Sequence, residues 1–285
     1  MSSRAEKIAS LIKEMGLDTI KGFEERDPQY IAISKLCASI KDKCTVAVLT
    51  ILNSLVSYML TGRGERHWNY FSEYFSRKGT IKDPCLDFLE YASTSPYLAR
   101  LRAAKLNRIR KICSDEVLSE LMHCGIDLDE LAGRLGKALE VDWRSKTIVF
   151  AVKMAYYAFR ACGHEFQRLP SVPIPVDYRV STITHCSGLS KEEPRVLMGK
   201  QRLVQEIWEQ ISKLSGVPAI NLDSLVWVMG GALIYNDFNI DKAMSELMGM
   251  VPNKEKIARE LLLEFSRSCR EGGVTIGKVS SDRDA

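Results

Sequence analysis

The chain has 285 residues, of which 46% are hydrophobic, so it is long enough for one large domain or two lobes with a sizeable core. Forty lysines and arginines against 36 acidic residues give a net charge of +4, a mild excess that permits a polyanionic partner without requiring one. The most apolar stretch, at 45–60, is too short and too interrupted by polar residues to span a bilayer, and the amphipathic N-terminus lacks a signal-peptide core. We therefore expect a soluble cytoplasmic protein that makes no contact with a membrane.

The eight cysteines are scattered, with no CxxC pair and no cluster with histidine. This spacing predicts reduced intracellular thiols and neither a zinc nor an iron–sulfur site. The cysteines stand at positions 37, 44, 85, 113, 124, 162, 186 and 269.

Apolar residues recur at spacings of three and four along nearly the whole chain, and sustained alternation is absent, so the fold class is predicted to be all-α. Asp127 with Glu130 resembles a capping box, and Asp142 is a plausible N-cap for the helix that follows it. Helices are expected near 3–15, 29–42, 45–60, 65–77, 84–93, 97–112, 115–123, 128–139, 144–162, 178–187, 199–214, 220–234, 241–249 and 254–269.

One long irregular segment, GHEFQRLPSVPIPVDYR at 163–179, contains three prolines that forbid a helix there. It is predicted to join two helical masses. The polar, glycine-containing end of the chain, 271–285, is expected to be a mobile tail.

Two lysines lie in an otherwise apolar helix, WRSKTIVFAVKMAYYAF at 143–159. Lys146, Phe150 and Lys153 fall within about 60° of one another on a helical wheel, so an aromatic ring is flanked by two amines. Both lysines could simply extend from a half-buried helix to water. Alternatively, Lys146 in the first turn, where the helix dipole disfavours an ammonium, is a candidate amine nucleophile.

Asp177 follows the last proline, where the chain turns back into helix, so its carboxylate is predicted to cap that helix. A capped carboxylate stays ionised. An ionised carboxylate is also the group that would stabilise a positive charge developing on a sugar during catalysis. The structural and the catalytic interpretations are therefore compatible.

The segment YLARLRAAKLNRIRKIC at 97–113 carries six basic residues and no acidic one. Such a helix commonly has a solvated face, but in a DNA-binding protein it would contact phosphates. The residues predicted to make phosphate contacts are Arg100, Lys105, Arg108, Arg110 and Lys111.

Several motifs in order resemble one family. SKTIVFAVKMAYYA and IPVDYRVSTITHCSGL, together with RDPQYIA, SYMLTGRGERHWNYF, TSPYLA and NLDSLVWVMGGALIY, are similar to the archaeal 8-oxoguanine DNA glycosylase/AP lyases, the AGOG family of the helix-hairpin-helix DNA glycosylases. The resemblance runs from about residue 20 to about residue 240. In place of the superfamily's glycine-rich hairpin turn, this chain has LEVDWRS at 139–145, which contains no glycine.

The resemblance implies two helical lobes with a helix-hairpin-helix-like element and the active site in the cleft between them. It assigns 30–160 to a helical-barrel lobe that ends in that element, and 1–29 plus 161–270 to the second lobe. It also implies a monomer that acts on damaged DNA containing 8-oxoguanine, without metal or cofactor.

The same resemblance implies the residue roles. Lys146 would attack C1′ of a flipped nucleotide, expel the base and form a Schiff base, after which β-elimination cuts the strand; Asp177 would stabilise the sugar cation. Phe150 and Trp227 would stack on the base. The remaining substrate-binding residues would be Gln29, Trp68, Lys153 and Asp223.

Each of these residues also has a plainer interpretation: Phe150 and Trp227 as core aromatics, and Gln29 as a solvent-facing helix residue. Two other functions stay open. One is a lysine-dependent glycosylase of the same superfamily that prefers oxidised pyrimidines. The other is a non-catalytic helical protein that binds DNA damage.

Overall fold

The computed structural model describes residues 3–124 and 127–271, and these residues form sixteen α-helices and two short 3-10 turns without a β-strand. The predicted all-α fold class is confirmed. The chain divides into two compact units, with breaks after Asp27 and after Val172. We call residues 28–172 the middle unit, and the segments on either side of it together the terminal unit.

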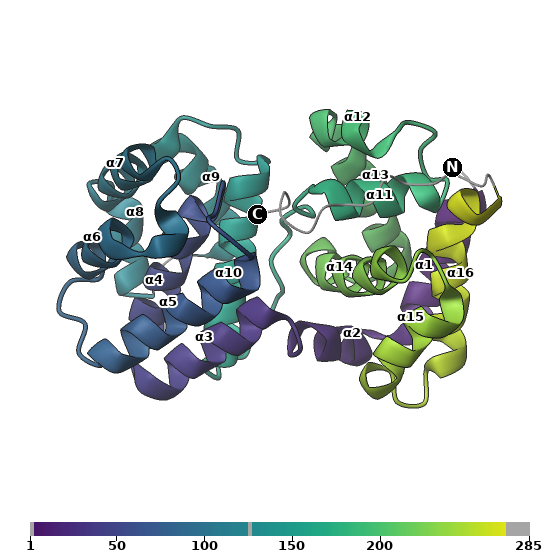
Figure 1. Cartoon of the computed structure of the whole chain (residues 1–285), viewed down its shortest axis with the longest axis horizontal. Coiled ribbons are helices and arrows are strands. Elements are labelled where there is room, and N and C mark those ends of the chain that lie inside the picture. Colours follow the sequence, from purple (N-terminus) through teal and green to yellow (C-terminus); the bar gives the residue numbers. More distant parts are fainter. Residues whose placement is uncertain (1–2, 125–126, 272–285) are drawn as a thin grey trace. The chain divides into compact units, whose positions relative to one another are not determined.

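The middle unit is built around α4 (Lys43–Val56), in which every residue from Cys44 onward is buried. Asp42 caps this helix by accepting hydrogen bonds from the amides of Cys44 and Thr45. A helix that is buried on all sides must be surrounded by others, and α10 packs along it. The other helices of the unit are α3 (Pro28–Ser39), α5 (Gly64–Lys78), α6 (Pro84–Thr94), α7 (Arg102–Cys113), α8 (Glu116–Met122), α9 (Leu128–Leu139) and α10 (Lys146–Ala161), as labelled in Figure 1.

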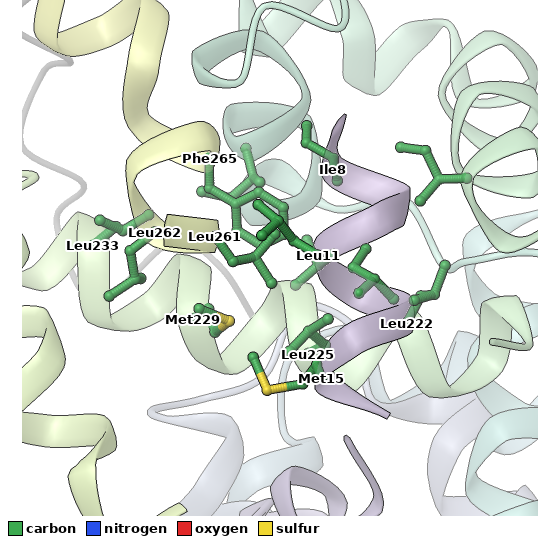
Figure 2. Packing of buried hydrophobic residues seen from close by; sticks show 14 of the residues in the cluster. Ile8, Leu11, Met15, Leu222, Leu225, Met229, Leu233, Leu261, Leu262 and Phe265 are labelled. Carbon is green, nitrogen blue, oxygen red and sulfur yellow. The ribbon is translucent and has the colours of Figure 1, made fainter. Parts of the chain in front are cut away.

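The terminal unit has its own core, centred on α14 (Ala219–Tyr235). Figure 2 shows Leu225, Met229 and Leu233 of this helix pointing toward side chains of α1 and α16. Each fully buried side chain of this size contributes about 1.5–3 kcal/mol of transfer free energy, so this cluster holds the first and last described helices of the chain together. The helices of the unit are α1 (Ser3–Met15), α2 (Leu17–Glu24), α11 (Tyr178–Cys186), α12 (Pro194–Gly199), α13 (Gln201–Ser215), α14, α15 (Ile240–Leu247) and α16 (Glu255–Glu271).

Most predicted helices are present within a few residues, and the differences have local causes. The helix expected from 97 begins only at Arg102, because Leu101 has a left-handed backbone (φ 54°) and Pro96–Leu98 forms a separate 3-10 turn. Two short helices, α2 and α12, were not predicted. They are too short to show a full apolar period, and Gly16 (φ 84°) breaks the pattern before α2.

The proline-containing segment is irregular as predicted, but its first part belongs to the middle unit. The ring of Phe166 lies 5.2 Å from that of Tyr156, and the amide of Ser171 donates to the Asp129 carboxylate, which also pairs with Arg168. These contacts place the break after Val172, whereas the predicted break falls after residue 160. The predicted tail, 271–285, lies outside the described residues except for Glu271.

The prediction of reduced thiols is wrong, because all eight cysteines are paired. Three disulfides lie in the middle unit and one in the terminal unit. The partners are 28 to 125 residues apart in the sequence, so local spacing, which was the basis of the prediction, carries no sign of them. The pairs are Cys37–Cys162, Cys44–Cys124, Cys85–Cys113 and Cys186–Cys269.

Among residues 3–124 and 127–271, no single helix is long and apolar enough to cross a membrane. Gln201–Ser215 and Ala219–Tyr235 reach that length and composition only as a pair, and they are bent by 106° relative to each other. The same residues contain no group of three or more histidine, cysteine or acidic side chains that could hold a metal ion.

Candidate active site

A helical hairpin in the middle unit leads directly to Lys146. Helix α9 ends in a Schellman motif, in which the amide of Val141 donates to the carbonyl of Gly136 at 2.9 Å and the amide of Glu140 donates to that of Lys137 at 3.2 Å. Glu140 adopts the left-handed conformation (φ 56°) that glycine usually takes at this point. The hairpin therefore forms without a glycine in its turn.

The glycine that this hairpin requires lies inside α9. A Cβ atom at Gly136 would lie 3.0 Å from the carbonyl oxygen of Val141 and 3.1 Å from the Cα atom of Trp143. Because both are backbone atoms, neither can rotate away. Gly136 thus allows the turn to fold closely against α9 and fixes where α10 begins.

We expect Gly136→Ala to lower both thermal stability and activity, because the added methyl group pushes the turn away from α9 and displaces the start of α10. Gly133→Ala is the matched control, since a Cβ at that position meets nothing within 4 Å. Alanine is favoured over glycine inside a helix by about 0.8–1 kcal/mol, so the control should be slightly stabilised. Thermal midpoints and lesion-excision rates of the two variants check this, and equal effects would contradict the role assigned to Gly136.

Lys146 is the first residue of α10, and its side chain is exposed. The N-cap of this helix is Ser145, not Asp142 as predicted. Asp142 instead stabilises the preceding turn, where its carboxylate accepts from the amide of Arg144 at 2.9 Å and its carbonyl accepts from the amide of Ser145. The consequence is that Lys146 lies nearer to the positive end of the helix than an Asp142 cap would have placed it.

The other two members of the predicted stripe differ in their environments. Phe150 is partly exposed, and its ring meets that of Trp68 edge to face, with centroids 6.3 Å apart. Trp68 itself is only 1% exposed, so it supports Phe150 from within the core. Lys153 is buried (3% exposed), with Nζ 5.1 Å from the centroid of the Tyr157 ring.

Helix α3, which contains Gln29, packs against both α5 and α10. Gln29 is partly buried near the start of α3, and the ring of the next residue, Tyr30, meets that of Tyr157 edge to face at 5.2 Å. Five predicted site residues therefore lie on three neighbouring helices of the middle unit. They are Gln29, Trp68, Lys146, Phe150 and Lys153.

The terminal unit contains the other three predicted site residues. Asp177 is the N-cap of α11, and its Oδ1 accepts from the amide of Val180 at 2.8 Å, as predicted. Asp223 and Trp227 both lie on α14, one helical turn apart. Asp223 is 4% exposed, whereas Trp227 is only partly buried.

One residue next to Trp227 was not predicted. Arg179 lies on the first turn of α11, and its guanidinium covers the Trp227 ring. An arginine in the first turn, two residues after an aspartate cap, is unfavourable for the helix dipole, and this was the sequence signal that could have singled it out.

The predicted phosphate-binding helix, α7, is less available than its sequence suggests. Lys105 is fully buried, with Nζ 3.4 Å from the carbonyl oxygen of Met59, and burial together with Arg100 and Arg102 lowers its pKa to about 8. Because Lys105 holds a loop inside the unit, its predicted contact with phosphate is wrong.

The other four predicted phosphate ligands lie at or near the surface. Arg108 is partly buried, donates to the carbonyl of Leu55 and lies 5.0 Å from the Tyr58 ring centroid. Lys111 forms an ion pair with Glu140. Arg100 and Arg110 are exposed and are the best placed to meet a polyanion.

Helix α5, in the same part of the middle unit, contains a buried histidine. His67 is fully buried, with Nε2 3.1 Å from the Ser57 hydroxyl. Burial and the positive charge of Lys105 lower its pKa from 6.5 to about 3. The folded protein therefore keeps this imidazole neutral in weak acid.

We expect the free energy of unfolding to fall as the pH drops from about 6.5 towards 3. In this window the unfolded chain binds a proton at His67 that the folded chain does not, so stability increases with pH. His67→Gln should reduce this part of the slope, and His123→Gln, which changes an exposed histidine, should leave it unchanged. Urea denaturation at several pH values measures it; equal slopes for wild type and His67→Gln would contradict the assignment.

Comparison with known proteins defines the class of the chain. The family model described as N-glycosylase/DNA lyase, AGOG, matches residues 9–260. The N-glycosylase/DNA lyase of Pyrobaculum aerophilum is 36% identical over 238 residues, which cover 82% of this chain and 89% of the relative. The enzyme of the same name from Thermococcus kodakarensis is 31% identical, over 80% of this chain and 85% of the relative.

A solved structure extends the similarity to the fold. The crystal structure of the 8-oxoguanine DNA glycosylase from Pyrobaculum aerophilum, complexed with 8-oxoguanosine, matches with a TM-score of 0.76 and 32% identity, over 92% of this chain and 96% of that one. The class is thus a DNA repair glycosylase with lyase activity. The chain belongs to the AGOG family of N-glycosylase/DNA lyases.

Proposed function

We propose that this N-glycosylase/DNA lyase removes 8-oxoguanine from DNA, with Lys146 as the nucleophile. The observation that carries the proposal is the position of Lys146, an exposed amine on the first residue of α10, one turn from the partly exposed ring of Phe150. The structural neighbour that binds 8-oxoguanosine supports the choice of substrate. The protein would act as a monomer on the chromosome, inside the cell.

The chemistry begins with a nucleotide flipped out of the duplex, because C1′ of the sugar is inaccessible within the stack. The neutral amine of Lys146 attacks C1′, and the base leaves with the electron pair of the glycosidic bond and takes up a proton. The sugar ring opens to an imine on Lys146. Loss of a proton from C2′ then expels the 3′ phosphate, which breaks the strand on the 3′ side of the lesion.

Asp177 would stabilise the positive charge that develops on the sugar as the base departs. Its hydrogen bond with the amide of Val180 holds the carboxylate in place at the start of α11. A carboxylate that is already fixed needs no reorganisation during the reaction. It is also suited to take part in the proton transfers of the second step.

Recognition of the base would combine stacking with hydrogen bonding. Phe150 and Trp227 would stack on the base, a contact worth about 1–3 kcal/mol per base. Stacking cannot distinguish 8-oxoguanine from guanine, since they differ in a hydrogen on N7 and an oxygen at C8. Asp223 or a backbone carbonyl would accept the N7 hydrogen, Gln29 would read the Watson–Crick edge, and Lys153 and Trp68 would complete the pocket.

The experiment that tests the function is borohydride trapping on matched duplexes that carry 8-oxoguanine, an oxidised pyrimidine or no lesion. We expect a covalent complex and strand cleavage chiefly with the 8-oxoguanine duplex, which should also compete best. Stronger trapping by the oxidised pyrimidine would favour the pyrimidine glycosylase. Binding without any trapped complex on either lesion would instead favour the non-catalytic function.

We expect Asp177→Asn to slow both base release and strand cleavage, by roughly 10²-fold, while the protein stays folded, because asparagine still caps α11 but lacks the charge. Single-turnover rates and the thermal midpoint measure the two effects separately. A variant that releases base at the wild-type rate would show that Asp177 is only a helix cap.

A further inference from the structure

The guanidinium of Arg179 lies over the ring of Trp227. Its Cζ atom is 3.9 Å from the centroid of the indole ring, well inside the range of a strong cation–π contact. Its Nη1 also donates to the backbone carbonyl of Trp227 at 2.9 Å. One arginine thus holds both the ring and the main chain of the same tryptophan.

The guanidinium is also held by Tyr235. Nη2 donates to the hydroxyl of Tyr235 at 3.0 Å, and Cζ lies 5.4 Å from the centroid of the Tyr235 ring. Tyr235 is 66% exposed, and this hydrogen bond ties its hydroxyl to Arg179. The planar fork of arginine suits this arrangement, because a lysine could not make both hydrogen bonds while covering a ring.

Two adjacent glycines in α14 make room for this arginine. A Cβ atom at Gly231 would lie 2.9 Å from Nη1 of Arg179 and 3.3 Å from its Cζ, and one at Gly230 would lie 2.7 Å from Cγ1 of Ile183 on α11. Each glycine in a helix interior costs about 1 kcal/mol relative to alanine, so a pair of them needs a packing reason. The close approach of α11 and its arginine supplies that reason.

The position of Arg179 along α11 also connects it to Asp177. The residue lies two positions after the N-cap, in the first turn, where the helix dipole disfavours a cation by about 0.3–1 kcal/mol. That cost is offset by contacts with α14, not by contacts within α11. The same short segment therefore carries the Asp177 carboxylate and contacts Trp227.

We propose that Arg179 is a positioning residue that fixes Trp227 as a stacking plate with one available face, at a set distance from Asp177. The inference rests on the proposed function, since it assumes that Trp227 stacks on the flipped base. With the guanidinium on one face of the indole, the base can stack only on the other. Arg179 itself need not touch DNA.

A double-mutant cycle tests this proposal. We expect Trp227→Ala to lower single-turnover excision of 8-oxoguanine by about 10-fold to 100-fold, the range given by loss of one stacking contact. Arg179→Met should lower it about 5-fold to 10-fold in the wild-type background and less than about 2-fold in the Trp227→Ala background, because it acts through Trp227. Effects that multiply would overturn the proposal.

Gly231→Ala perturbs the same contact while leaving the arginine in place, so it serves if Arg179→Met folds poorly. Gly231→Ala should reproduce the partial loss of activity. The control is Gly22→Ala, in the same unit, which should keep full activity because its added Cβ meets nothing within 4 Å. Arg195→Met, which removes an exposed charge from α12, controls for general loss of positive charge. Wild-type activity in both Arg179→Met and Gly231→Ala would overturn the inference.

Tryptophan fluorescence gives a readout that a purely structural role would not move. Arg179→Met should change the tryptophan emission when it is introduced into the wild-type protein. Introduced into the Trp227→Phe variant, it should leave the emission unchanged. If emission is insensitive in both chains, the arginine does not lie on the ring in solution. If Trp227→Ala excises at the wild-type rate while emission responds to Arg179→Met, the stacking role in the proposed function fails and the contact itself stands.

Discussion

A Lys146→Gln variant is expected to bind lesion-containing DNA with nearly unchanged affinity and to lose base release and strand cleavage together, by roughly 10³-fold or more. The amide of glutamine cannot attack carbon, so both steps, which share one covalent intermediate, stop at the start. Because Lys146 is exposed at the first position of α10, the substitution should leave the thermal midpoint almost unchanged. Gel-shift affinity, single-turnover excision and borohydride trapping measure the three properties.

Two other lysines give this experiment its controls. Lys137→Gln removes an exposed charge from the neighbouring helix α9 and should keep full trapping. Lys153 is the rival nucleophile on the same stripe, although it is buried with its amine near the Tyr157 ring. If Lys146→Gln still forms the cross-link and mass spectrometry finds the adduct on Lys153, the assignment of Lys146 is wrong.

The helices were predictable because burial on one face imposes a period that the sequence must carry. For α10 and α14, long apolar segments led to positions within two residues of the observed ones, and Asp177 begins α11 as the cap that the sequence predicts. The apolar period cannot predict where a helix begins when its first residues do not follow that period. The left-handed residue Leu101, which delays the start of α7, has no sequence signal because leucine rarely adopts that conformation.

Within the candidate site, the sequence predicts which residues share one face of a single helix. The stripe of Lys146, Phe150 and Lys153 follows from helix geometry alone, and α10 carries it. The difference between Lys146, which is exposed, and Lys153, which is buried, depends on neighbouring helices and could not be read from α10. The same limit explains Lys105, which shares its sequence context with exposed arginines but points into the unit.

In the hairpin before α10, the expected glycine is present but at a different position. The turn at 139–145 lacks the glycine that is usual in the superfamily. The structure satisfies the turn with Glu140 in the left-handed conformation and places the necessary small residue at Gly136, inside the preceding helix. A requirement for close backbone approach is a tertiary constraint, so the position that meets it is not fixed by a linear motif.

The second large effect is expected from reduction of the disulfides. The four pairs close loops with sequence separations of 125, 80, 28 and 83 residues. On the chain-entropy account, closing loops of this size stabilises a fold by about 3.5–5 kcal/mol each, although nested loops do not add fully. Reduction should therefore lower the thermal midpoint by tens of degrees, since 1 kcal/mol corresponds to about 2–4 °C for chains approaching this size.

The single disulfide of the terminal unit has a particular consequence for activity. Cys186 ends α11 and Cys269 lies in α16, so this bond ties the helix that begins at Asp177 to the last described helix of the chain. A double Cys186→Ala, Cys269→Ala variant removes only this tie. We expect it to be less stable than wild type and to lose excision activity at a lower temperature, while its activity at 25 °C changes little.

The measurement combines thiol counting with melting. Protein purified without reductant should show no reactive thiols after denaturation, and eight after treatment with a phosphine reductant, accompanied by a large fall in the thermal midpoint. A variant with all eight cysteines changed to alanine should melt at a lower temperature than wild type and should not respond to the reductant. Eight reactive thiols in the untreated, denatured protein would mean that the pairs do not form in solution, and the stability of the fold would then have to come from the two helical cores alone.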